Sequence, residues 1–180
     1  MKQIGNWENV QEGNQQLKAG IYLATIVEVQ DVGEKSYLRI GFDITEGEFK
    51  NYFKNQATGE KWPYLGTIIR SYKESALTWF KAFITAIEKS NDGFTWRWNE
   101  KDLVGKKFVV VYGEEEYLDE DSNELKIGLK PVDVRSIKAL QEGKIVVPPL
   151  KKIKNTDLPS DKPSVNKPKV ELIKDEDLPF

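Results

Sequence analysis

Aromatic and basic side chains are interleaved at several places in this chain of 180 residues. Where such residues point outward, the rings can stack on nucleobases and the cations can contact phosphates. The positions that combine these properties are Tyr37, Arg39, Lys50, Tyr52, Lys54, Trp62, Tyr64, Arg70, Trp96, Arg97, Trp98, Lys106 and Lys107. For any one of these aromatic residues, packing against the core is an equally good interpretation. The clustering therefore predicts a surface for single-stranded nucleic acid, whereas Phe49, Phe53 and Phe108 are assigned to the core.

The composition excludes several kinds of catalysis. The chain has no Cys and no His, which removes disulfides, zinc–thiolate sites and the usual general base. Carboxylates could still hold Mg²⁺, and the best set is Glu114, Glu116 and Asp133 with Lys126 or Lys130 nearby. No fixed motif supports this alternative, a metal-dependent nuclease. We therefore predict a protein that is not an enzyme and that has no cofactor or metal.

The net charge of −2 is at first unfavourable for a nucleic-acid binder. The acids are concentrated in 113–124 and at the C-terminal end, however, which leaves room for a basic face elsewhere. The first residues lack an apolar signal region, and no segment is apolar over the length of a membrane span. We expect a cytoplasmic protein.

Alternating apolar positions predict strands in the first half of the chain. The strand expected over 21–29 has an apolar face made by Ile21, Leu23, Val27 and Val29. The next strand is expected to turn Leu38, Ile40, Phe42 and Ile44 inward, and Tyr37, Arg39, Gly41 and Asp43 outward. A third strand is expected over 49–55, with Lys50, Tyr52 and Lys54 on one face.

One helix is expected after the third strand. Ser71 and Glu74 have the spacing of a capping box, with Ser71 as the N-cap. The apolar face that follows consists of Leu77, Phe80, Phe83, Ile84 and Ile87. Strands over 106–112 and 125–130 come next, separated by an acidic turn at 113–124, and Pro131 predicts a bulge or bend.

This order of elements predicts a mainly β fold, a five-stranded OB barrel with one helix between the third and fourth strands. An N-terminal arm is expected at 1–17 and the OB domain at 18–147. Residues 148–180 are rich in Pro, Lys and Asp and poor in aromatics, which predicts a disordered tail.

The tail ends in an acidic and apolar tip made by Asp175, Glu176, Asp177, Leu178, Pro179 and Phe180. A terminal Phe after charged residues suits capture by another protein, with an apolar slot for the ring and a basic rim for the carboxylates. The tip resembles the acidic C-terminal tip of bacterial single-stranded DNA-binding proteins. The stretches 18–22, 37–42 and 103–111 resemble a phage family of single-stranded DNA-binding or recombination-associated proteins.

These resemblances imply a function in DNA replication, recombination or repair, in the host cytoplasm if the protein is encoded by a bacteriophage. The body would coat single-stranded DNA without sequence preference, and the tip would recruit replication or recombination proteins. A homo-oligomer such as a dimer is compatible with the sequence, but the tetramer of the bacterial family is not carried over. An adaptor that binds only proteins is a third alternative.

Overall fold

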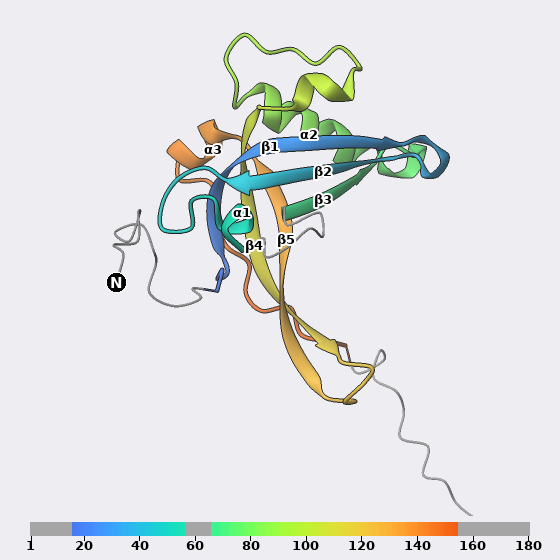
Figure 1. The fold of residues 1–180 in the computed structure, drawn as a ribbon, viewed down its shortest axis with the longest axis vertical. Coiled ribbons are helices and arrows are strands. Elements are labelled where there is room, and N and C mark those ends of the chain that lie inside the picture. The colour runs from blue at the N-terminus through green and yellow to red at the C-terminus, as the bar shows by residue number, and fades with distance from the viewer. Residues whose placement is uncertain (1–15, 57–65, 155–180) are drawn as a thin grey trace, which may run out of the picture.

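The fold consists of strands of 6 to 13 residues and helices of 5 to 12 residues (Figure 1). The computed structural model describes residues 16–56 and 66–154. The elements are β1 Gly20–Val32, β2 Tyr37–Ile44, α1 Tyr52–Gln56, β3 Gly66–Ser71, α2 Leu77–Glu88, β4 Lys107–Leu118, β5 Leu125–Arg135 and α3 Ile137–Gln141. Three short 3₁₀ turns, Gly33–Lys35, Glu74–Ala76 and Glu100–Leu103, lie between them.

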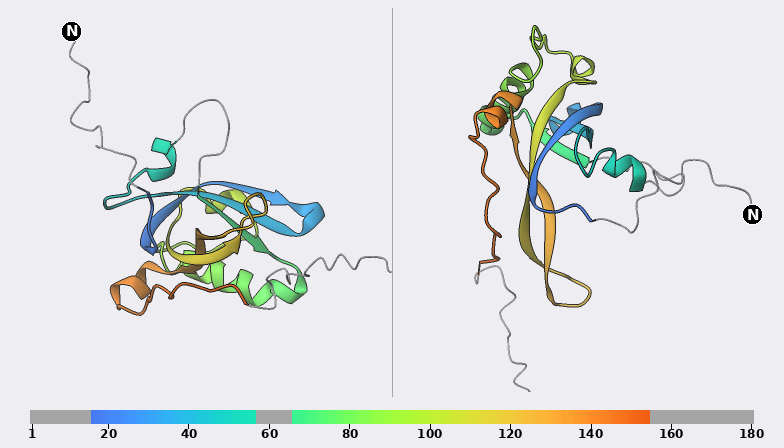
Figure 2. Two further views of the ribbon diagram at one scale, coloured as in Figure 1. Left: turned by 90° about the horizontal axis from the view of Figure 1, so that it is seen from below. Right: turned by 90° about the vertical axis from the view of Figure 1, so that its left-hand side faces the viewer.

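The five strands form one antiparallel sheet in the order β3-β2-β1-β4-β5. The prediction of a mainly β fold with a helix between the third and fourth strands is confirmed. In the part of the chain that is described, the sheet is open, with β3 and β5 as its edges, so the closure that a barrel requires is not formed. The strongly bent strands and the helices that flank them can be followed in Figure 2.

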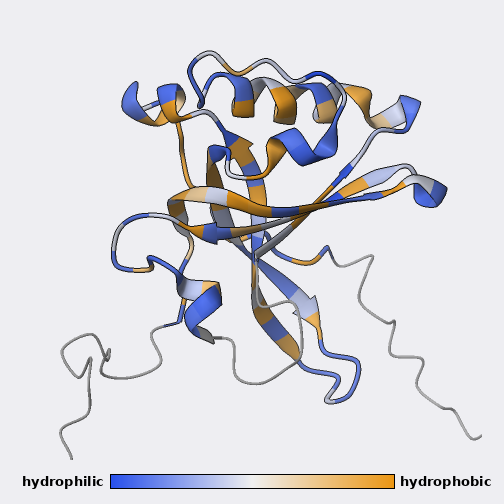
Figure 3. Cartoon of the chain, turned by 45° about the horizontal axis from the view of Figure 1, so that its top comes forward, coloured by the Kyte–Doolittle hydropathy of each residue, from blue (hydrophilic) through white to orange (hydrophobic). Residues whose placement is uncertain are grey.

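The core lies between the sheet and α2. Leu38, Ile40 and Phe42 of β2 are buried, as are Phe83 and Ile87 of α2. The buried residues of β2 are two positions apart and those of α2 are three to four positions apart, as the sequence predicted. Figure 3 shows the apolar and polar segments that alternate along α2. The helix therefore covers one face of the sheet, and on the other face Arg39 and Ile69 are exposed.

The predicted apolar face of the first strand is wrong. Ala24 and Ile26 are the fully buried residues of β1, while Val27 is 48% exposed. A bulge between Ile26 and Glu28 shifts the register against β2, and it returns Val29 to the side of Ile26. Because β1 pairs with β4 through its first half and with β2 through its second, it must bend, and the bulge provides the bend.

The predicted strand over 49–55 is also wrong, because residues 52–56 form α1. Asp43, predicted to face outward, is buried and accepts hydrogen bonds from the backbone N–H groups of Phe53 and Lys54, at 3.1 and 3.0 Å. A carboxylate in this position satisfies the free N–H groups at a helix start. Gly41, also predicted to face outward, is buried as well.

The predicted helix start at Ser71 is wrong by several residues. Ser71 is the last residue of β3, and α2 begins at Leu77 without a side-chain cap. The Ser71 hydroxyl donates to the carbonyl of Ser36 (3.2 Å) and accepts from the N–H of Lys73 (3.3 Å). It thus ties β3 to the turn between β1 and β2. Leu77, predicted to be on the buried face, is 48% exposed.

The hairpin of β4 and β5 is longer than predicted, because β4 continues to Leu118. The bulge predicted at Pro131 is confirmed, since Tyr112 pairs with Pro131 but Val111 pairs with Asp133. Beyond the hairpin, the chain returns along the edge of β4. Lys151 accepts a hydrogen bond from Glu116 N and donates one to Glu114 O, both 2.9 Å. The segment 148–154, the first part of the predicted tail, thus reaches β4.

Candidate nucleic-acid interface

Tyr37 and Arg39 lie on the face of β2 that points away from α2, as the alternation predicted. The register places Arg39 between Gln30 of β1 and Ile69 of β3. Tyr37 lies in the next row, between Val32 and Ser71. We call the surface made by these six residues the outer face. Its two rows bring an aromatic ring, a guanidinium and apolar surface together, which is the mixture that holds single strands.

The two rows of the outer face carry one charged side chain, that of Arg39, and the exposed Glu28, opposite Gly41 in the next row, lies on the same side of the sheet. Neither of its two rows contains a carboxylate, and Arg39 is exposed without an ion pair or hydrogen bond to any residue that the structure describes. Lys35, in the turn before β2, is exposed next to these rows. Ile69 is 56% exposed and adds apolar surface beside Arg39. The surface can therefore receive a phosphate at Arg39 and a base at Tyr37 or Ile69.

Trp96 and Trp98 lie elsewhere, in the loop between α2 and β4. Their rings are 4.9 Å apart, and Trp96 in turn contacts Phe80 of α2 at 5.6 Å. The Trp96 indole donates to the carbonyl of Asn99 (2.9 Å), and its backbone N–H donates to Glu88 (3.0 Å). Both the ring and the backbone of Trp96 are therefore held by hydrogen bonds. Trp98 is 83% exposed.

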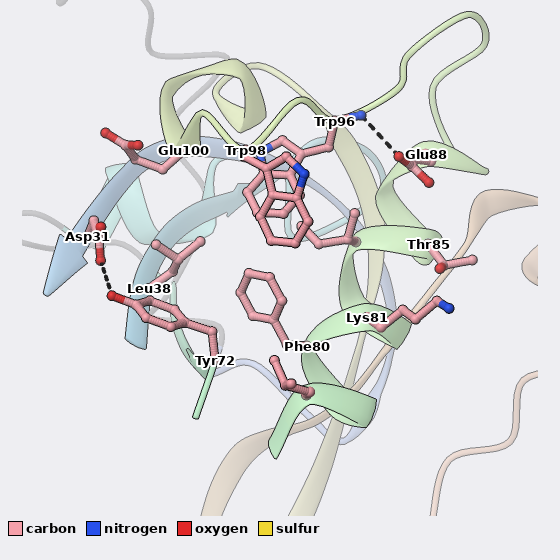
Figure 4. Close-up of a pocket in the computed structure, with 12 residues that line it drawn as sticks. Asp31, Leu38, Tyr72, Phe80, Lys81, Thr85, Glu88, Trp96, Trp98 and Glu100 are labelled. Atoms are coloured by element: carbon pink, nitrogen blue, oxygen red, sulfur yellow. Dashed lines mark hydrogen bonds between the residues drawn. The ribbon is translucent and has the colours of Figure 1, made fainter. Parts of the chain in front are cut away.

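A cleft of about 730 Å³ opens beside the two tryptophans (Figure 4). Its lining consists of Asp31, Leu38, Tyr72, Leu77, Phe80, Lys81, Ile84, Thr85, Glu88, Trp96, Trp98 and Glu100. Leu38 faces this cleft, whereas its neighbours Tyr37 and Arg39 face the outer face, because successive side chains of a strand point to opposite sides. The structure thus places Tyr37 and Arg39 on one face of β2 and the two tryptophans beside the other.

Lys50, Tyr52 and Lys54 do not form a strand face. The Tyr52 hydroxyl accepts a hydrogen bond from the N–H of Leu17 (3.2 Å), and its ring packs edge-on against Phe53 at 5.2 Å. Lys50 and Lys54 are exposed in the turn and helix around it. Tyr52 is therefore part of the packing at this end of the sheet.

The same aromatic cluster tests the three core assignments. Phe108 is fully buried, as predicted. Phe53 is half-buried and packs against the core, and Phe49 is half-buried against Tyr22 at 5.7 Å. Burial also raises the pKa of Tyr112, which joins this cluster through Tyr22, so its hydroxyl stays neutral.

The remaining predicted cations are scattered. Arg70 points to the core side, with its guanidinium 5.7 Å from the centre of the Phe83 ring, and burial lowers its pKa below the ordinary value of an arginine. The ammonium of Lys106 lies 4.3 Å from the centre of the Phe94 ring. Lys107 is exposed and opposite Thr25, so it lies on the same side of the sheet as Arg39. Arg97 is exposed between the two tryptophans.

Several predicted residues lie outside the described residues. These are Trp62, Tyr64 and the tip, Asp175, Glu176, Asp177, Leu178, Pro179 and Phe180. The cleft was not predicted, because Tyr72, Phe80 and Asp31 come from distant segments. The pair Trp96 and Trp98, of which only Trp98 is exposed, was the only signal for it in the sequence.

Two of the three carboxylates of the alternative nuclease site, those of Glu116 and Asp133, have other partners. Glu116 accepts a hydrogen bond from the N–H of Ile153 (3.1 Å), and Asp133 pairs with Arg135 (2.6 Å). Over 16–56 and 66–154, no three carboxylates are grouped closely enough to hold a metal ion.

Comparison with known proteins finds no family model that matches this chain and no curated protein that matches its sequence. None of the described helices is long and apolar enough to cross a membrane.

Proposed function

We propose that the protein binds single-stranded DNA, without reading its sequence, on the outer face of β1, β2 and β3. The observation that carries this proposal is Arg39, an exposed cation that has no ion pair among the residues the structure describes and lies between Gln30 and Ile69, one row from Tyr37. A phosphate at Arg39 and bases on Tyr37 and Ile69 require no recognition of base edges. Lys35, in the turn before β2, and Lys107, at the start of β4, would add positive charge beside this surface.

We also propose that the sheet is of the OB type. The strand order β3-β2-β1-β4-β5 and the position of α2 between β3 and β4 support this assignment, since an OB barrel is partly open. OB folds bind oligonucleotides on the face of their second and third strands, which here is the outer face. The turn between β4 and β5 is acidic, with Asp119, Glu120, Asp121 and Glu124, so DNA would avoid that end.

The biological role that fits this activity is the coating of single strands during replication, recombination or repair, and the resemblance of the tip and body supports a phage origin. The tip, 175–180, would recruit replication or recombination enzymes. Deletion of 175–180 should then abolish partner binding and leave the affinity for DNA unchanged or slightly higher. Loss of DNA affinity in the truncated protein would instead place the tail in the DNA site.

The proposal is tested by titrating a labelled oligo-dT and a duplex of equal length at two salt concentrations. Arg39→Ala should weaken oligo-dT binding and reduce the slope of log affinity against log salt by about 0.7, the value for one phosphate contact on a single strand. Arg135→Ala removes the same side chain from β5, where it pairs with Asp133, and should leave both quantities unchanged. Tighter binding to duplex, or Mg²⁺-dependent cleavage of the oligo-dT, would refute the proposed activity.

A further inference from the structure

The cleft beside Trp98 has a floor of apolar side chains and a rim of carboxylates. Phe80 and Leu77 of α2 and the two tryptophans make its apolar surface (Figure 4). Asp31, Glu88 and Glu100 stand at its edges, and Lys81 is the one cation among the residues that line it. Its volume of about 730 Å³ falls within the range of roughly 300–1,000 Å³ that is typical of ligand sites.

Trp98 is held in place before any ligand arrives. Its backbone has a φ of +65°, a conformation that bulky residues rarely adopt and that persists only when the surroundings impose it. The surroundings do so here, because Trp96 is hydrogen-bonded at its indole and at its backbone, and Asn99 caps the following turn through the N–H of Lys101. An indole that is 83% exposed on such a fixed loop buries almost nothing in the protein itself. The exposed indole is, however, positioned to pack against a side chain of a partner protein.

The carboxylates of the rim retain acceptor capacity. Asp31 accepts one hydrogen bond, from the hydroxyl of Tyr72 at 2.8 Å, and Glu88 accepts one from Trp96 N at 3.0 Å. The carboxylate of Glu100 has no hydrogen-bond partner within 16–56 and 66–154. With three carboxylates against one ammonium, the cleft repels a phosphodiester chain and attracts a cation. A guanidinium or ammonium over the face of Trp98 would also gain from the ring's quadrupole.

We propose that this cleft docks a segment of a partner protein in which an Arg or Lys stands next to an apolar side chain. The cation lies over Trp98 within reach of Asp31 and Glu100, and the apolar side chain packs on Phe80 and Leu77. Because Leu38 faces the cleft while Arg39 faces the outer face, the partner and the DNA strand occupy opposite sides of β2 and do not compete. The protein would then join a second protein to the strand that it coats, by a contact independent of the tip.

The test uses the full chain and two fluorescein-labelled peptides, Ala-Arg-Leu-Arg-Ala and Ala-Glu-Leu-Glu-Ala, in anisotropy titrations. The arginine peptide should bind and the glutamate peptide should not. Trp98→Ala should weaken the arginine peptide about tenfold or more, as expected for an aromatic anchor. Trp79→Ala is the matched control, since Trp79 is 75% exposed on α2 outside this cleft, and it should change nothing.

A charge reversal gives a second, independent readout that does not depend on the tryptophan. Glu100→Lys should weaken the arginine peptide and improve the glutamate peptide, and the thermal midpoint of each variant reports that it remains folded. Equal binding of both peptides, or binding of neither at millimolar concentration, overturns the proposal. So does an oligo-dT affinity that falls in Trp98→Ala but not in Arg39→Ala, because DNA would then be the occupant of the cleft. Loss of oligo-dT binding in Arg39→Ala alone tests the outer face and leaves this inference standing.

Discussion

Substitution of Asp43 should lower the free energy of unfolding by removing the contacts that hold α1 against β2. One oxygen of its carboxylate accepts from the N–H groups of Ile44 (2.8 Å) and Phe53 (3.1 Å), and the other accepts from the N–H of Lys54 (3.0 Å). The side chain therefore joins the end of β2 to the start of α1. Phe53 of that helix packs edge-on against Phe42 of the core, with ring centres 5.8 Å apart.

The expected loss in Asp43→Ala has two parts. Removal of a helix cap costs about 1 kcal/mol. A buried N–H that loses its acceptor, here that of Ile44, costs about 2 kcal/mol more. We therefore expect the free energy of unfolding to fall by about 3 kcal/mol, a large part of the 5–15 kcal/mol typical of a domain. Asp43→Asn keeps one oxygen but turns an amide N–H₂ toward the N–H of Lys54, so it should lose only about 1 kcal/mol.

Urea unfolding followed by circular dichroism measures both losses, provided that the slope m stays constant between variants. Asp92→Asn is the control, because Asp92 is exposed in the turn after α2 and should stay within about 0.5 kcal/mol of the parent protein. If Asp43→Ala is as stable as that control, the cap does not hold α1 against β2, and our account of the end of the sheet is wrong.

Further predictions concern packing and pH. Gly66→Ala should destabilise the protein by about 1–3 kcal/mol in the same urea assay. The added Cβ would stand 2.5 Å from the Phe42 ring and 2.8 Å from that of Phe53, and an unchanged midpoint would contradict this packing. Hydrogen bonds from Lys151 and Lys130 lower the pKa of Glu115 from 4.5 to about 2. Because the folded pKa is depressed, the stabilisation is complete above pH 4.5 and is lost as the pH falls from 4.5 toward 2. The protection of the Lys151 amide, which is its hydrogen-exchange rate relative to the intrinsic rate at each pH, should therefore fall in that window in the parent protein, whereas in Glu115→Gln it should be low throughout.

The sequence alone determined the parts of the fold that rest on local periodicity. The alternation of Leu38, Ile40 and Phe42 predicted the inner face of β2, and it placed Tyr37 and Arg39 on the other side. The spacing of Phe80, Phe83 and Ile87 likewise predicted the buried face of α2. These predictions hold because each side chain's direction depends only on the period of its own element.

Tertiary contacts decided what local patterns leave open. The aromatic and basic residues of 49–55 led to the prediction of a strand, but a carboxylate nine residues before Tyr52 caps the start of a helix there. The apolar face of β1 changed phase because two different strands pair with its two halves, which requires a bulge. The periodicity of one segment does not show which carboxylate will cap it or which strands will pair with it.

The candidate sites also depend partly on residue type, which the sequence shows, and partly on tertiary structure. The sequence identified Arg39, Trp96 and Trp98 by residue type and predicted one shared surface for them. Only the folded chain decided that Trp98 faces an acid-rimmed cleft with Leu38, while Arg39 faces the acid-free rows with Gln30. The physical reason is that a surface is assembled from segments far apart in the chain, so its charge and its members depend on how the strands pair and where the helix packs.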